Sequence, residues 1–173
     1  MKLIQELNPD DPAQNKLYFE CGTDERVLKR DSFPRNMASN GELFIPEGIE
    51  QIAEGALRGL NHQHTVHFPK SLRKLGAKLF AECFSLRRIA PLTIVYQGSS
   101  EEFVALAAPI KEEKYESDGY DHYPYYSGGS RRVTEYHSFD EWADDIRVEC
   151  RADGVTLLYG SNNHLNTEPP KRL

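Results

Sequence analysis

The chain has 173 residues, of which 39% are hydrophobic and 28% are charged, and its formal net charge at pH 7 is -6. This length is typical of one domain with a modest core, and the negative charge disfavours binding to nucleic acid or to an anionic membrane, because both need a positive field. No stretch approaches the roughly 20 apolar residues of a membrane span, and the first residues lack the apolar region of a signal peptide, so we expect a cytoplasmic protein.

Residues 1–42 show weak patterning and are predicted to form an N-terminal cap. Two short apolar runs stand out in this segment, at residues 17–21 and 26–28. Alternating runs of this kind favour strands. We therefore predict that they pair as a hairpin that covers the open face of the segment that follows.

Residues 43–98 contain an internal repeat, in which the pattern that begins at position 43 recurs from position 66. The returning positions are apolar or proline: Leu43, Ile45, Pro46, Ile49, Ile52, Leu57 and Leu60 return as Val66, Phe68, Pro69, Leu72, Leu75, Phe80 and Cys83. A 23-residue period indicates a stack of units, none of which can bury its apolar face alone. The apolar positions of both copies are therefore predicted to form one continuous core.

Each unit of the repeat predicts a short strand that ends at a proline. The strands cover residues 43–45 and 66–68, and the segments 53–59 and 76–82 are predicted to form single helical turns. A third unit begins at Leu86 and Ile89, but the sequence after it no longer follows the repeat pattern. The alternation places a further set of side chains away from the core, aligned across three units: Glu42, Phe44, Thr65, His67, Arg88 and Ala90.

The repeat resembles that of the BspA-like leucine-rich-repeat family, whose units carry the pattern I-P-x-x-V-x-x-I-G-x-x-A-F-x-x-C-x-x-L-x-x-I. Residues 72–89 match best, and the first unit departs from the pattern at Ala53, Leu57, Leu60 and Gln63. Residues 94–103 resemble the Y-x-G-T-x-E-E-W segment that closes such arrays, and residues 148–155 resemble the V-x-C-x-D-G strand that follows. The resemblance, over about residues 43–106 and 138–157, implies a mixed α/β fold: a small right-handed leucine-rich-repeat solenoid of short strands and helical turns, capped at both ends, with no family-wide catalytic site.

Residues 99–160 are predicted to form the C-terminal cap, followed by a flexible polar tail at residues 161–173. Ser99 and Glu102 have the spacing of a capping box, in which each side chain bonds a free backbone N–H at the start of a helix. Ser138 and Glu141 repeat this signal, so the two segments are either related caps or two common helix starts.

The cap contains an insertion at residues 111–136 that holds six of the nine tyrosines of the chain, together with several glycines and serines. Tyrosine offers a large contact area at low rotamer cost, and glycine and serine let a loop adapt, so the mixture is typical of binding loops. We predict partner contacts at Tyr120, Tyr123, Tyr125 and Tyr126. Alternatively, the tyrosines pack onto the side of the repeats. The acidic start and basic end of the insertion also have the charges to pair with each other.

The outward row of the repeat strands is the second candidate surface. Phe44, His67 and Arg88 have the residue types of a protein-binding surface. In the alternative interpretation, the row belongs to a packed or capped sheet face.

Metal, disulfide and cofactor sites are not predicted. His62, His64 and His67 do not obviously converge, as metal ligands must. The three cysteines, Cys21, Cys83 and Cys150, are scattered without a C-x-x-C spacing, and the chain has no phosphate-binding loop or nucleophile motif.

These features predict a non-catalytic protein-binding module, acting as an adaptor, a complex subunit or an accessory factor, with another protein as its partner. One alternative is a small acidic inhibitor or immunity-type protein that occludes a basic partner. Another is an enzyme, or a metal- or carbohydrate-binding module, that uses the tyrosine-rich segment and the histidines.

Overall fold

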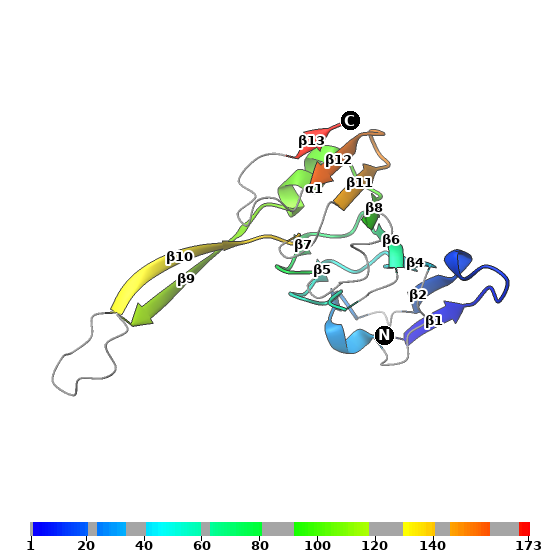
Figure 1. Ribbon diagram of the computed structural model, residues 1–173, viewed down its shortest axis with the longest axis horizontal. Helices are drawn as coiled ribbons and strands as arrows, with labels where there is room; N and C mark the ends of the chain where they lie inside the picture. Colours follow the sequence, from blue (N-terminus) through cyan, green and yellow to red (C-terminus); the bar gives the residue numbers. More distant parts are fainter. Residues whose placement is uncertain are drawn as a thin grey trace.

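A computed structural model describes residues 2–20, 24–33, 41–59, 63–80, 92–117, 130–140, 146–159 and 170–173 (Figure 1). Strands are the predominant secondary structure of these residues, and the largest sheet has eight strands. Its spatial order is β1 (Lys2–Glu6), β2 (Lys16–Glu20), β4 (Gly41–Phe44), β6 (Gln63–Phe68), β8 (Leu92–Tyr96), β11 (Ile146–Cys150), β12 (Thr156–Tyr159) and β13 (Lys171–Arg172). The pairing is parallel from β2 to β11 and antiparallel at both ends.

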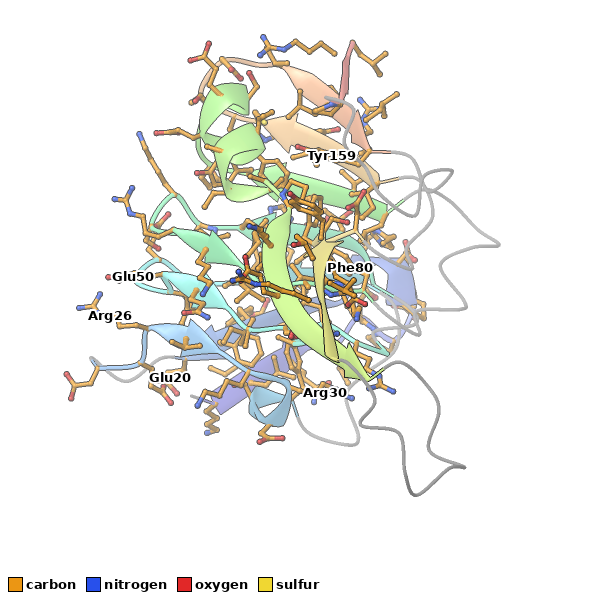
Figure 2. All side chains as sticks on the ribbon, turned by 90° about the vertical axis from the view of Figure 1, so that its left-hand side faces the viewer. Glu20, Arg26, Arg30, Glu50, Phe80 and Tyr159 are labelled. Carbon is orange, nitrogen blue, oxygen red and sulfur yellow. The ribbon has the colours of Figure 1, made fainter. Side chains whose placement is uncertain are left out.

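A second sheet holds three short parallel strands, β3 (Val27–Leu28), β5 (Gln51–Ile52) and β7 (Lys74–Leu75). The inward side chains of both sheets form one apolar core. All the predicted core residues of the repeat belong to it: Ile45, Ile49, Ile52, Leu57, Phe68, Leu72, Leu75 and Phe80. Figure 2 shows Phe80 and Tyr159 among the packed side chains of the body, whereas Arg26 and Glu50 lie at its margin. The prediction of one continuous core is therefore confirmed.

The repeat period appears directly in the strand register. Leu43 pairs with Val66 in the large sheet, and Ile52 pairs with Leu75 in the small one. The next layer breaks the period, because Val66 pairs with Ile94 and not with Ile89, the position that a constant period predicts. The predicted third unit at Leu86 and Ile89 lies outside the described residues, and β8 takes its place in the sheet.

The predicted fold class, a mixed α/β leucine-rich-repeat solenoid with helical turns, is wrong. Strands predominate among the described residues, in sheets of mixed parallel and antiparallel pairing, with a single α-helix, α1 (Ser100–Leu106). Residues 54–59 form turns, closed by bonds such as Arg58 N–H to the Gly55 carbonyl, and the described part of 76–82 also contains no helix. Gly55 and Gly59 have φ angles of 58° and 73°, a left-handed conformation that does not continue a right-handed helix.

The predicted N-terminal hairpin is also wrong. Strand β2 pairs with β1 and β4, whereas β3 belongs to the other sheet. Leu17 pairs with Leu43, and Leu28 with Ile52, so this segment adds one more layer to both sheets. It also contains the 3-10 helices η1 (Pro12–Gln14) and η2 (Arg30–Ser32).

The C-terminal part closes the core with α1 and an aromatic cluster. The predicted capping box is confirmed, since Ser99 and Glu102 bond each other's backbone N–H groups. Phe103, on the buried side of α1, makes edge contacts with Tyr96, Phe139 and Tyr159 at centroid distances of 5.4, 5.7 and 5.9 Å. Of the second predicted cap, Ser138 lies outside any helix and Glu141 is outside the described residues.

The segment predicted as a polar tail contains a short strand among its described residues. Strand β13 pairs with β12, so residues 171 and 172 belong to the large sheet. Residues 161–169 lie outside the described part of the chain.

A two-stranded ribbon projects from the body (Figure 1). It consists of β9 (Ile110–Ser117) and β10 (Ser130–His137), paired antiparallel over their whole length. The start and end of the predicted tyrosine-rich insertion thus form paired strands. Within the described residues, no helix is both long and apolar enough to cross a membrane.

Candidate binding face

One face of the eight-stranded sheet points away from the core and carries a row of apolar and aromatic side chains at one register. Ile4 pairs with Tyr18, Tyr18 with Phe44, Phe44 with His67, and His67 with Val95. The side chains of Tyr18, Phe44 and His67 are partly exposed, and we call these three residues the aromatic row. Because directly opposed side chains on adjacent strands lie about 5 Å apart, the row is a continuous strip across β2, β4 and β6.

The centre of the aromatic row is a stacked pair. The rings of Phe44 and His67 are nearly parallel, at 8°, with their centroids 4.0 Å apart. Nε2 of His67 lies 2.8 Å from a carboxylate oxygen of Glu42, and the His67 side chain is 19% exposed. The imidazole is thus fixed by a ring on one side and a carboxylate on the other, so the pair presents its outer surface in one orientation.

Tyr18 is held in a similar way at the neighbouring strand. Its hydroxyl donates a hydrogen bond to the carboxylate of Glu6 on β1. This bond to Glu6 is the main reason why the pKa of Tyr18 lies above its ordinary value. The ring of Tyr18 is thus anchored by its polar end.

The surroundings of the aromatic row are polar and carry both charges. The same face presents the following aligned side chains in the next row of the sheet: Glu6, Lys16, Glu42, Thr65, Thr93 and Arg147. An apolar strip bordered by charged and hydroxyl groups is the usual composition of a protein-binding surface, with an apolar centre and a polar rim. At Val95 the strip ends, because that side chain is buried.

The structure brings together two of the seven predicted contact residues, Phe44 and His67. Arg88 lies outside the described residues, and the register puts Val95 rather than Ala90 beside His67 and Thr93 beside Thr65. Arg88 and Ala90 both lie outside the described residues, and the constant period that would align them with this row does not continue into β8.

The predicted contacts of the insertion, Tyr120, Tyr123, Tyr125 and Tyr126, also lie outside the described residues. They belong to the segment 118–129, which connects β9 to β10. The ribbon that precedes and follows this segment is exposed and charged. Its acidic start and basic end are joined by an ion pair between Glu113 and Arg132.

Sequence reasoning missed Ile4 and Tyr18. A signal for Tyr18 was present, because Leu17, Tyr18 and Phe19 repeat the apolar-aromatic-apolar order of Leu43, Phe44 and Ile45. The interval between these two triplets is longer than the repeat period, so a search at that period does not align them.

The histidines that were weighed as metal ligands have different partners in the part of the chain that the structure describes. His64 bonds the carbonyl oxygen of Ala13 at 3.2 Å, His67 bonds Glu42, and His62 is not among the described residues. The pairing of β4 with β6 shifts in register at His64, and this residue and His67 bond separate groups.

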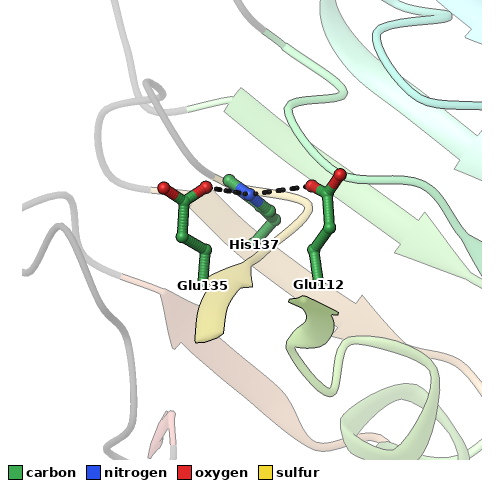
Figure 3. Close-up of side chains that lie close together, drawn as sticks. All are labelled: Glu112, Glu135 and His137. Atoms are coloured by element: carbon green, nitrogen blue, oxygen red, sulfur yellow. Dashed lines mark ion pairs between the residues drawn. The ribbon is translucent and has the colours of Figure 1, made fainter. Parts of the chain in front are cut away.

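A different group of potential metal ligands lies at the base of the ribbon (Figure 3). Nε2 of His137 is 3.3 Å from one carboxylate oxygen of Glu112 and 3.3 Å from one of Glu135. The ammonium group of Lys114 lies 2.8 Å from Glu135 and 3.6 Å from Glu112. Its hydrogen bond to Glu135 raises the pKa of Lys114 and lowers that of Glu135. The charge that a metal ion would supply is thus already provided by a lysine, and we interpret this cluster as an ion-pair network.

Comparison with known proteins gives no assignment: no family model, curated protein or solved structure matches the chain. The resemblance to BspA-like repeats therefore stays a prediction.

Proposed function

We propose that this protein is a non-catalytic protein-binding module, acting as an adaptor, a complex subunit or an accessory factor, and that it binds its partner through the aromatic row. One observation carries the proposal: Tyr18, Phe44 and His67 stand at one register on three adjacent strands, on the face opposite the core. A contiguous aromatic strip with a polar border is typical of protein-binding surfaces.

The fixed orientation of the row supports a recognition role. Glu6 holds Tyr18, and Glu42 together with Phe44 holds His67, so binding would immobilise few additional rotamers. Ordering a flexible side chain at an interface costs about 0.5–1.5 kcal/mol. Preorganised aromatic side chains avoid most of this cost, which is why tyrosine is enriched at the centres of binding surfaces.

The ribbon supports a second contact. Strands β9 and β10 project from the body (Figure 1), and the tyrosine-rich segment 118–129 connects them in the sequence. A partner that reached both surfaces would gain from two linked contacts. We therefore include Tyr120, Tyr123, Tyr125 and Tyr126 in the proposed binding set, with the cytoplasm as the proposed compartment.

The experiment uses three immobilised forms of the full chain in parallel: the natural sequence, the double variant Phe44→Ser/His67→Ser, and the triple variant Tyr123→Ser/Tyr125→Ser/Tyr126→Ser. Proteins captured from the native host are identified by mass spectrometry, and the binding of each purified candidate is then measured by calorimetry. We expect each variant to weaken binding of the true partner at least tenfold, since anchors of this type contribute about 2 kcal/mol or more each.

The control is Lys74→Ser, at an exposed residue of the small sheet and away from the aromatic row. It should leave both binding and the melting temperature unchanged. A partner that binds the double variant as tightly as the natural chain would overturn the proposed face. Equal binding by the triple variant would remove the ribbon segment from the site.

A further inference from the structure

Strand β1 forms the longer open edge of the eight-stranded sheet. Among the described residues it pairs only with β2, whereas the opposite edge is the two-residue strand β13. An edge strand exposes a row of backbone N–H and C=O groups that can pair with another strand. Natural edges are usually blunted by proline, a bulge, an inward-pointing charge or charged side chains, especially lysine. Strand β1 carries Lys2 and Glu6 at its ends, but it has no proline, pairs with β2 without a register shift, and turns Leu3 and Gln5 toward the core side.

The sequence of β1 is complementary to itself when read in the opposite direction. It runs Lys2, Leu3, Ile4, Gln5, Glu6, with a base at one end, an acid at the other and an isoleucine in the centre. If two copies pair antiparallel about Ile4, Lys2 of each copy stands opposite Glu6 of the other. Opposite charges directly across an antiparallel pair are stabilising, and like charges are destabilising.

We propose that β1 is a self-association edge, through which two copies of this chain form a two-fold symmetric dimer with one continuous sheet. Such an interface is isologous, so every contact occurs twice. The two Lys2–Glu6 pairs fix the register, because a shift by two positions in either direction leaves each lysine without its carboxylate. In this register Leu3 of one copy stands opposite Gln5 of the other on the core side.

The dimer would join the candidate binding faces of the two copies. An antiparallel pair has its two-fold axis perpendicular to the sheet, so both aromatic rows lie on the same side. Ile4 pairs with Tyr18 within each copy, and the two Ile4 side chains meet at the axis. The exposed strip then runs from His67 of one copy to His67 of the other. The glutamate that holds Tyr18 is also the one that receives Lys2 from the second copy.

The test compares the full chain, with a C-terminal tag, with charge variants of β1 by sedimentation velocity at physiological ionic strength. A concentration series from ~1 µM to ~500 µM covers the range in which small interfaces associate. The variants are Lys2→Glu, Glu6→Lys and the double variant Lys2→Glu/Glu6→Lys. Lys74→Glu, on an exposed lysine of the other sheet, makes the same change in net charge as Lys2→Glu but away from β1.

We expect the natural chain and Lys74→Glu to show a concentration-dependent dimer. Each single variant places like charges opposite each other at both ends and should shift the dissociation constant at least tenfold toward monomer. The double variant restores both opposite-charge pairs and should dimerise. An equimolar mixture of the two single variants should form a heterodimer, because an acid at position 2 of one chain then faces a base at position 6 of the other.

Three outcomes overturn the proposal. The first is a natural chain that stays monomeric over the whole series. The second is dimerisation of the single variants as strong as that of the natural chain. The third is a failure of both the double variant and the mixture to recover association. Hydrogen exchange gives a second readout, because backbone amides of β1 should become more protected with rising protein concentration. The binding test of the aromatic row uses residues of β4 and β6, so the two proposals fail independently.

Discussion

The body and the ribbon of this protein are built from strands in two different ways. In the body, one column of inward side chains crosses the large sheet: Leu17, Leu43, Val66, Ile94, Val148 and Leu157. All of them are at most 1% exposed. In the ribbon, no side chain that the structure describes between 110 and 117 or between 130 and 137 is buried.

The ribbon relies instead on pairing between its own strands. Every residue of β9 faces one of β10, and ion pairs join Lys114 to Glu135 and Glu113 to Arg132. Two-stranded hairpins are marginally stable in water, and exposed ion pairs contribute little and are screened by salt. Stability is therefore concentrated in the body, and the two regions should respond separately to mutation, salt and pH.

The largest expected effect comes from removing core volume in the body. Phe80→Ala deletes a ring that is 1% exposed and should lower the free energy of unfolding by about 3–5 kcal/mol, as measured by urea denaturation. Leu7→Ala, at a side chain that is 60% exposed, is the control and should stay within about 0.5 kcal/mol. A cost below about 1 kcal/mol for Phe80→Ala would mean that this part of the core is loosely packed.

The second effect concerns how closely the layers of the body stack. A Cβ atom added at Gly76 would lie 2.3 Å from the backbone nitrogen of Glu54 and 2.5 Å from the carbonyl carbon of Ala53. Gly76→Ala should therefore cost about 1–3 kcal/mol through overpacking. The equivalent position one layer earlier already carries Ala53, so Ala53→Gly is the control, with an expected loss of about 1 kcal/mol or less. Equal costs at the two sites would show that Gly76 is not limited by the layer beneath it.

The core of the body was predictable because it follows a period. Apolar residues such as Ile49 and Leu72 occupy equivalent places in successive units, and the strand register uses the same period. The first layer escaped detection because Leu17 precedes Leu43 by a longer interval than Leu43 precedes Val66. The helical turns were predicted wrongly because Gly55 and Gly59 adopt left-handed conformations, which a count of helix-forming residues does not reveal.

The ribbon could not be predicted from apolar periodicity, since charged residues occupy both of its faces. Its signal was the opposite charge of its two ends, which indicated pairing but not strands. The candidate site was half predictable: Phe44 and His67 follow from the repeat, whereas Tyr18 and Ile4 depend on the irregular first layer and on β1. Spacing within a regular array is readable from sequence, but the register of an irregular layer is set by packing in three dimensions.

A smaller, pH-dependent effect belongs to the body. Asp153 accepts hydrogen bonds from the hydroxyl of Ser100 at 2.7 Å and from its backbone N–H at 2.8 Å, and these bonds lower the pKa of Asp153. The unfolded carboxyl, with a pKa of about 3.9, takes up its proton before the folded one. The unfolded state therefore binds more protons in this window, and stability falls as the pH drops through it.

The variant Asp153→Asn removes this contribution. Its urea midpoint should fall less than that of the natural chain between pH 5 and pH 3, a window set by the unfolded pKa of about 3.9. Other carboxyl groups with lowered pKa, such as Glu102 and Glu135, act in the same direction in both proteins, so the comparison isolates Asp153. Identical pH profiles would show that the bonds from Ser100 do not distinguish the folded from the unfolded state.

The smallest expected effect on global stability is in the ribbon. Lys114 bridges Glu112 and Glu135 on opposite strands, and all three side chains are at least 36% exposed. Lys114→Ala removes the bridge and leaves two carboxylates facing each other across the pair. We expect faster hydrogen exchange at the backbone amides of β9 and β10 and an unchanged urea midpoint of the body.

Adding ~1 M NaCl to the natural chain should likewise speed exchange in the ribbon alone, because the Debye length falls to about 3 Å. Lys74→Ala, on an exposed lysine of β7, is the control and should leave exchange in the ribbon unchanged. If Lys114→Ala lowered the midpoint of the body, the two regions would be one cooperative unit, and the contrast in how they are built would not extend to how they unfold.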